Sequence, residues 1–182
     1  MQSINVDPTL FLLAQTLDDI EALRKAQNNR LRTLTAPATP DKDGVIRDLG
    51  IDPTEPTVML IADITDTLET VEHATILQLQ RAMRKHPLRA WQKATDGVGE
   101  KQLARLVAII DDPYINSSTG QPRTVSQLWA YCGLHTKPDK DGVNRAAKRQ
   151  RGQRANWSPQ AGSRAYLIAE SCMKQRTSPY RP

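Results

Sequence analysis

Two glycines separated by one residue are the part of this chain best suited to binding a phosphate. Gly97, Val98 and Gly99 lie between two apolar-rich segments, and Lys101 and Gln102 follow them closely. Glycines let a backbone approach a phosphate, and the free N–H groups at the start of a following helix favour an anion. The spacing predicts a phosphate site at this turn, with Lys101 and Gln102 contacting the same strand. A plain helix–helix turn with a glycine cap is the alternative.

A second candidate site is a group of cations nearer the C-terminus. Five of them fall within ten residues, just before Trp157, and they are Arg145, Lys148, Arg149, Arg151 and Arg154. Because predicted helices lie on both sides, we expect a presented loop that neutralises phosphates and makes binding steeply salt-dependent. The alternative is a basic disordered tail.

The distribution of charge supports the same interpretation. The chain has 182 residues and a net charge of +5, and residues 1–90 carry −3, residues 91–136 carry 0 and residues 137–182 carry +8. Such a concentration of cations at one end is typical of a surface for a polyanion, and nucleic acid is the commonest intracellular one. DNA is the preferred ligand, and structured RNA stays open.

The residue types that bind metals or catalyse reactions form no usable pattern in this sequence. Asp63, Asp66 and Glu69 fall on one predicted helix, where we expect a solvated face rather than a metal site. Cys132 and Cys172 lie forty residues apart, and with only three histidines they form neither a disulfide framework nor a zinc site. We therefore predict no catalytic residue, no metal and no cofactor.

The hexapeptide PDKDGV occurs twice, at residues 40–45 and 138–143. Its D-x-D-G core suggests a calcium loop, but an EF-hand needs an oxygen ligand two residues earlier and a glutamate at the twelfth position. Thr39 and Gly50 hold those places in the first copy, and Lys137 and Lys148 in the second. Both copies are therefore interpreted as turns.

Two long helices are expected before the candidate sites. Asp7-Pro8 is a cap followed by proline at the first helical position, and a heptad seam follows. That seam consists of Leu10, Leu13, Leu17, Ile20, Arg24, Gln27, Leu31 and Leu34. The pattern fits a coiled-coil arm with a register-setting polar layer, or an ordinary amphipathic helix.

Residues 35–56 contain four prolines and two glycines and are interpreted as a connector. A second helix is expected over 57–86, and the two helices fold back as an antiparallel hairpin that leaves apolar surface for a second copy. The sequence thus predicts a homodimer through the N-terminal helices. The expected stripe on the second helix is Ile61, Ile64, Leu68, Val71, Ile76, Leu79 and Met83.

Shorter helices are expected downstream, over 88–94, 100–110, 124–131 and 160–175, with the glycine turn between the first two. The predicted fold is all-α, with a long antiparallel helical arm (1–87) and a small helix-hairpin-helix domain (88–182). Its expected apolar contributors are Trp91, Leu103, Leu106, Val107, Ile110, Leu128, Trp129, Tyr166, Leu167, Ile168, Ala169 and Met173. The longest apolar stretches have five or six residues, so we expect a cytoplasmic protein without a membrane partner.

The order GVGEKQLARLVAIIDDP, RTVSQLWAYCGL and KRQRGQRANWSPQAGSRAYLIAESCMK resembles the C-terminal domain of Piv-type insertion-sequence transposases and invertases. The resemblance covers just under half of the chain. It implies a helix-hairpin-helix, a helix ending in "GL", a basic arginine-glycine segment and a closing helix. Members also carry a RuvC-like DEDD nuclease domain, a catalytic serine after the "GL" helix and a structured guide RNA.

Two family features are missing from this sequence. No serine lies between Ser126 and Ser158, and residues 1–87 predict helices and a connector instead of an alternating nuclease fold. The leading hypothesis is a non-catalytic nucleic-acid-binding protein related to the C-terminal half of a transposase, from a mobile element or phage. The alternatives are a diverged transposase or recombinase with metal-dependent DNA cleavage, and a helical protein-interaction adaptor.

Overall fold

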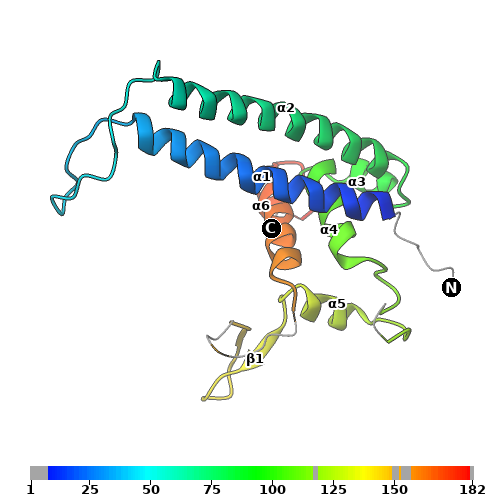
Figure 1. The fold of residues 1–182 in the computed structure, drawn as a ribbon. Coiled ribbons are helices and arrows are strands. Elements are labelled where there is room, and N and C mark those ends of the chain that lie inside the picture. The colour runs from blue at the N-terminus through cyan, green and yellow to red at the C-terminus, as the bar shows by residue number, and fades with distance from the viewer. Residues whose placement is uncertain (1–7, 117–118, 149–151, 153–156, 181–182) are drawn as a thin grey trace. The chain divides into compact units, whose positions relative to one another are not determined.

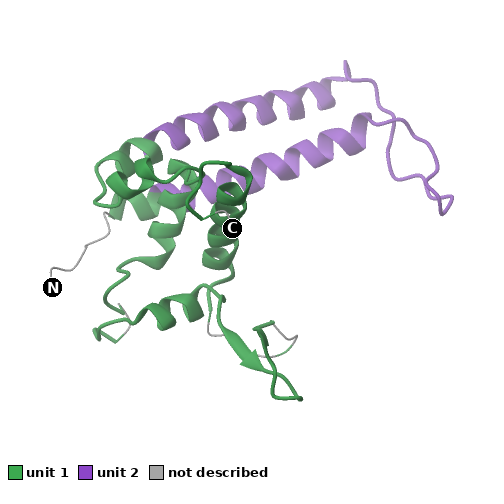
Figure 2. Ribbon diagram, turned by 180° about the vertical axis from the view of Figure 1, so that it is seen from behind, with its two compact units in different colours: residues 1–12, 79–182 green, residues 13–78 purple. Residues whose placement is uncertain are grey.

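The computed structural model describes residues 8–116, 119–148, 152 and 157–180. The chain divides into two compact units. We call residues 13–78 the helical unit and residues 1–12 with 79–182 the C-terminal unit (Figure 2). The division falls within the two long helices, whereas the sequence places its boundary at Pro87.

The helical unit consists mainly of two antiparallel helices, α1 (Pro8–Thr35) and α2 (Pro56–Arg84), as predicted (Figure 1). The connector between them contains no helix. Its last part returns to the end of α1, where Leu49 N donates to Thr33 O at 2.9 Å and Ile51 N donates to Leu34 O at 2.8 Å. These bonds use carbonyls that the last turn of a helix leaves without an intrahelical partner.

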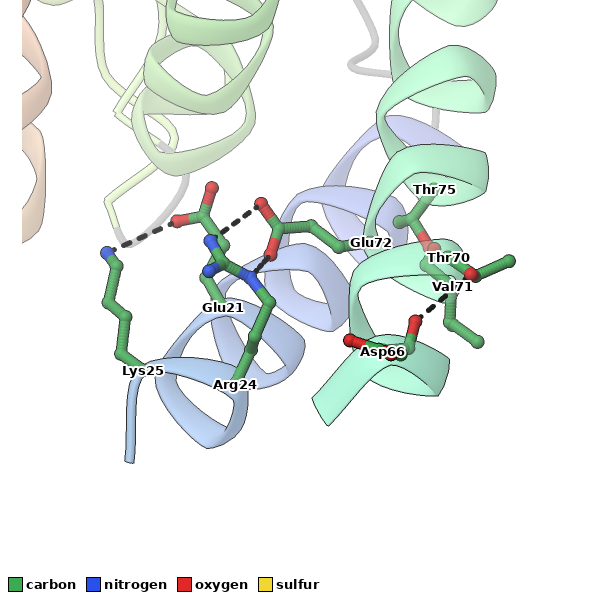
Figure 3. A network of polar contacts seen from close by, with 8 residues as sticks. All are labelled: Glu21, Arg24, Lys25, Asp66, Thr70, Val71, Glu72 and Thr75. Carbon is green, nitrogen blue, oxygen red and sulfur yellow. Dashed lines mark hydrogen bonds and ion pairs between the residues drawn. The ribbon is translucent and has the colours of Figure 1, made fainter. Parts of the chain in front are cut away.

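The heptad seam predicted for α1 is confirmed. Leu10 and Leu17 are 1% and 0% exposed, and the other seam positions are buried or half-buried. The polar position Arg24 belongs to this face, and its guanidinium Nε lies 2.5 Å from Glu72 Oε2 on α2 (Figure 3). This hydrogen bond raises the pKa of Arg24. The polar layer therefore links the two helices of the hairpin.

The stripe predicted for α2 is wrong at two positions. Ile64 and Val71 are 41% and 44% exposed, whereas their neighbours Thr65 and Glu72 are 5% and 8% exposed. The inward polar groups are satisfied, because Thr65 Oγ1 donates to Ile61 O at 2.8 Å and Glu72 accepts from the seam arginine. Hydrogen bonding thus permits a buried face that hydropathy alone does not identify.

The described residues of the C-terminal unit form four further helices: α3 (Arg89–Ala94), α4 (Glu100–Ile110), α5 (Val125–Tyr131) and α6 (Pro159–Lys174). α4 packs against α6. Thr124 forms a capping box with Gln127 at the start of α5, and the Ser158 hydroxyl accepts from Ala161 N at 3.2 Å. The all-α class and these helices agree with the sequence prediction.

A short two-stranded ribbon was not predicted. Strand β1 (Thr136–Pro138) pairs antiparallel with β2 (Asn144–Ala146), and the second PDKDGV copy makes the turn. All six strand residues are exposed. The ribbon therefore has no buried face of its own.

Several side chains expected in the core lie at the surface. Trp129 is 57% exposed and Tyr166 is 67% exposed, and Trp91, Leu167, Ala169 and Met173 are also exposed. α6 instead buries small residues, Ala161 and Cys172, at 0% and 4% exposure. Small side chains permit close packing between helices. The larger apolar residues of α6 therefore lie outside its most buried face.

Both cysteines are buried free thiols. Burial raises the pKa of the Cys132 thiol, which keeps it protonated and unreactive. Over the described part of the chain, no helix is both long enough and apolar enough to cross a bilayer.

Candidate nucleic-acid interface

The glycine turn is held from inside by a glutamine. α3 ends at Ala94, and the buried Gln92 donates from Nε2 to Val98 O at 2.7 Å. Val98 N donates to Thr95 O at 3.2 Å. Gln92 was not among the candidate residues, because nothing in the sequence distinguishes an inward glutamine from a solvated one on a six-residue helix.

Gly97 has a packing role. Its φ is +95°, and a Cβ at this position would lie 2.6 Å from Cys172 Cα and 2.8 Å from Cys172 N on α6. Val98 is 4% exposed, and its N–H already has an acceptor within the turn. These two residues therefore serve the contact with α6 and present little to a ligand.

The outer side of the turn is formed by Gly99, which is exposed. A side chain at this position would point into open space. Gln102 accepts from Arg164 Nη1 at 3.5 Å, so this glutamine already contacts α6. Lys101 is half-buried. The predicted hairpin site is thus reduced to Gly99 with its neighbours Lys101 and Gln102.

A carboxylate already occupies the start of α4. Glu100 lies in the first turn, its side chain is 16% exposed, and it pairs with Arg89 and, at 3.6 Å, with Arg84 Nε. An acidic group is favoured at this end of a helix dipole. A phosphate at the turn would compete with Glu100 for these two arginines, so the helix start alone is a weak anion site.

The second predicted site begins on the ribbon. Arg145 is on β2, its side chain is 69% exposed, and its Nε lies 2.6 Å from Asp139 Oδ2. Lys148 is exposed two residues beyond the strand. Arg149, Arg151 and Arg154, the other members of the predicted group, lie outside the described residues.

Trp157 supports the base of the ribbon. Lys137 Nζ lies 5.7 Å from the centre of its ring, and the His135 ring packs against it edge-on at 5.3 Å. Gly133 has a φ of +72°, and a Cβ there would lie 3.0 Å from Trp157 Cδ1, so the backbone conformation and the indole both favour glycine at this position. The ring therefore fixes the start of β1 and places one of its cations over an aromatic face.

Cations and carboxylates are divided between the two units. The C-terminal unit has 19 basic residues (Lys and Arg) and 8 acidic residues (Asp and Glu), which gives a net charge of +11. The helical unit has 6 basic and 12 acidic residues, which gives a net charge of −6. The predicted basic end is thus part of a larger basic unit that also includes Arg84, Lys85, Arg89 and Lys93.

The acidic residues give no metal site in the described parts of the chain. Asp63, Asp66 and Glu69 are exposed, and no group of three His, Cys, Asp or Glu side chains in the described ranges is placed to hold a metal ion.

No protein family, curated protein or solved structure matches this chain. The resemblance to Piv-type transposases therefore stays an expectation from sequence.

Proposed function

We propose that this chain is a non-catalytic nucleic-acid-binding protein that binds sugar-phosphate strands through the cations of its C-terminal unit. The observation that carries the proposal is the division of charge, +11 on one compact unit and −6 on the other. A charge spread that served only solubility has no reason to follow the boundary between folding units. A cationic unit attracts a polyanion and releases its counterions.

Duplex DNA is the ligand we favour. Lys101 beside the glycine turn and the exposed lysines of the ribbon suit contacts to phosphates, which position a protein without reading sequence. Relationship to the C-terminal half of a Piv-type transposase is part of the same proposal, and it rests on the order of sequence segments.

The test is a binding series by fluorescence anisotropy across salt concentration. Duplex DNA, single-stranded DNA and structured RNA of equal charge are compared. We expect tightest binding to duplex DNA, with affinity falling steeply as salt rises. Failure to bind any of the three at low salt would contradict the proposal. Preference for RNA would retain nucleic-acid binding and reject DNA as the ligand. Metal-dependent nicking of the duplex would favour the enzymatic alternative.

Pairing of copies through the helical unit is the second part of the proposal. Ile64 and Val71 are seven residues apart on α2, and with Leu60 they form an exposed apolar stripe that is distinct from the buried face of the helix. Such a stripe suits a helix of a second chain. Sedimentation should show a dimer that is lost when all three become glutamine, and a monomeric wild-type chain would contradict it.

A further inference from the structure

The two PDKDGV copies have the same structure as well as the same sequence. In the first, Asp41 Oδ1 accepts from the amides of Asp43 and Val45 at 2.9 and 3.0 Å. In the second, Asp139 Oδ1 accepts from the corresponding amides of residues 141 and 143, both at 2.9 Å. The glycines, Gly44 and Gly142, have φ of +75° and +73°. The hexapeptide PDKDGV therefore adopts the same turn at both positions in the chain.

The match extends to an ion pair beyond the turn. Arg47 Nε lies 2.9 Å from Asp41 Oδ2, and Arg145 Nε lies 2.6 Å from Asp139 Oδ2. Each aspartate thus uses one oxygen for the turn and the other for the arginine six residues later. Both carboxylates are fully occupied by their own hairpin.

The two copies differ in the residues that flank the shared turn. Over ten aligned positions, 39–48 and 137–146, Thr39 corresponds to Lys137, Ile46 to Asn144 and Asp48 to Ala146. The first hairpin has a net charge of −1 and the second a net charge of +1. All three differences make the second hairpin more positive or more polar. The shared turn does not require any of them.

The second hairpin also places like charges face to face. Lys137 is directly opposite Arg145 in the strand register, an arrangement that is unfavourable on a two-stranded ribbon. Asp139 neutralises the arginine, whereas Lys137 lies over the Trp157 ring and forms no ion pair with a described residue. With Lys140 exposed at the turn, the ribbon is a cationic projection with no buried face.

The dimensions of nucleic-acid grooves decide where such a ribbon fits. The major groove of B-form DNA, about 12 Å wide, admits a two-stranded ribbon, whereas the minor groove is about 6 Å wide. The major groove of A-form RNA is too narrow and deep for side chains to read. We propose that the β1–β2 ribbon enters the major groove of duplex DNA, with Lys137, Lys140 and Lys148 beside the phosphates. This inference rests on the proposed nucleic-acid binding.

The first hairpin supplies the design of the test. The triple variant Lys137→Thr, Asn144→Ile and Ala146→Asp gives the ribbon the flanking sequence of the first hairpin, which already forms the same turn. Its matched control is Lys93→Thr with Ala90→Asp on α3, an identical change of −2 at two exposed positions of the same unit. We expect the ribbon variant to lose about tenfold or more in affinity for duplex DNA, and the control about threefold or less. Circular dichroism checks the fold of both variants.

Methylation interference with the unaltered chain needs no variant. Methyl groups at guanine N7 lie in the major groove and those at adenine N3 in the minor groove, so interference is expected at guanine N7. If the chain binds no nucleic acid, the proposed function itself is wrong. If it binds DNA but the two variants lose equal affinity, or only adenine N3 methylation interferes, the function stands and the ribbon inference is wrong.

Discussion

At Gly97 the chain needs a glycine for packing rather than for the approach of a ligand. The sequence pattern Gly-Val-Gly predicts a turn correctly, but it does not tell which glycine faces outward. That depends on α6, whose backbone at Cys172 lies against Gly97 although 75 residues separate them. A contact at such separation leaves no local signal, so the two glycines could not be distinguished beforehand.

We predict that Gly97→Ala destabilises the fold and Gly99→Ala does not. Alanine at a φ of +95° is strained, and its Cβ would lie 2.6 Å from Cys172 Cα, so the free energy of unfolding should fall by about 2–4 kcal/mol. Gly99 has a φ of −74° and open space around it, so its variant should stay within about 1 kcal/mol of wild type. Urea unfolding measures both. Equal stabilities of the two variants would disprove this packing role.

His86 is a second residue whose role comes from its surroundings. It lines an apolar cavity of about 380 Å³, and its Nδ1 accepts from Leu88 N at 3.2 Å, so the neutral ring carries its proton on Nε2. That nitrogen is buried and has no hydrogen-bond partner among the described residues. Burial lowers the pKa of His86 from its usual 6.5.

The pH dependence of stability follows from this shift. Below pH 6.5 the unfolded chain binds a proton at His86 that the folded chain does not, so acidification favours unfolding. Stability linked to His86 is complete above pH 6.5 and decreases as pH falls from there toward the lower folded pKa. Urea unfolding at pH 7.5 and 5.5 should show wild type losing more stability than His86→Gln. The same loss in both proteins would rule out His86 as the source.

At the scale of elements, local patterns predicted the helices well. Caps such as Ser158-Pro159 and breakers such as Pro87 act within a few residues, so they locate helix ends from sequence. The α2 face was predicted less well, because Thr65 and Glu72 are inward only through partners that hydropathy ignores. The β1–β2 ribbon was missed since three exposed residues per strand give no alternation, although PDKDGV correctly predicted its turn.

The Arg24–Glu72 pair gives a prediction at this scale. Glu72 is 8% exposed, and replacing it with glutamine keeps its size and one acceptor oxygen but removes the negative charge that pairs with Arg24 on the other helix. The free energy of unfolding should fall by about 1–3 kcal/mol. Asp63→Asn, which removes the same charge at an exposed position of α2, should change it by less than about 0.5 kcal/mol. Thermal or urea unfolding compares the two. A loss no larger for Glu72→Gln than for the control would show that the pair adds nothing.

At the scale of the whole molecule, the division of charge predicts how the affinity for DNA depends on salt concentration. Log affinity falls as log salt concentration rises, and each phosphate contact makes the slope of that fall steeper by about 0.9. If the C-terminal unit makes those contacts, cations there contribute to the slope, and cations of the helical unit do not. The slope counts released counterions, so it separates local contacts from a general change of net charge better than affinity does.

Two variants with four substitutions each test this directly. In one, Lys85, Lys137, Lys140 and Lys148 of the C-terminal unit become glutamine, and in the other Lys25, Arg30, Arg32 and Lys42 of the helical unit do, so net charge falls equally. All eight side chains are exposed, so the folds should be retained. The slope for duplex DNA should become shallower by about 2–3 in the first variant and by less than about 1 in the second. Equal changes would mean that binding senses only total charge, and a larger change in the second would place the DNA on the helical unit.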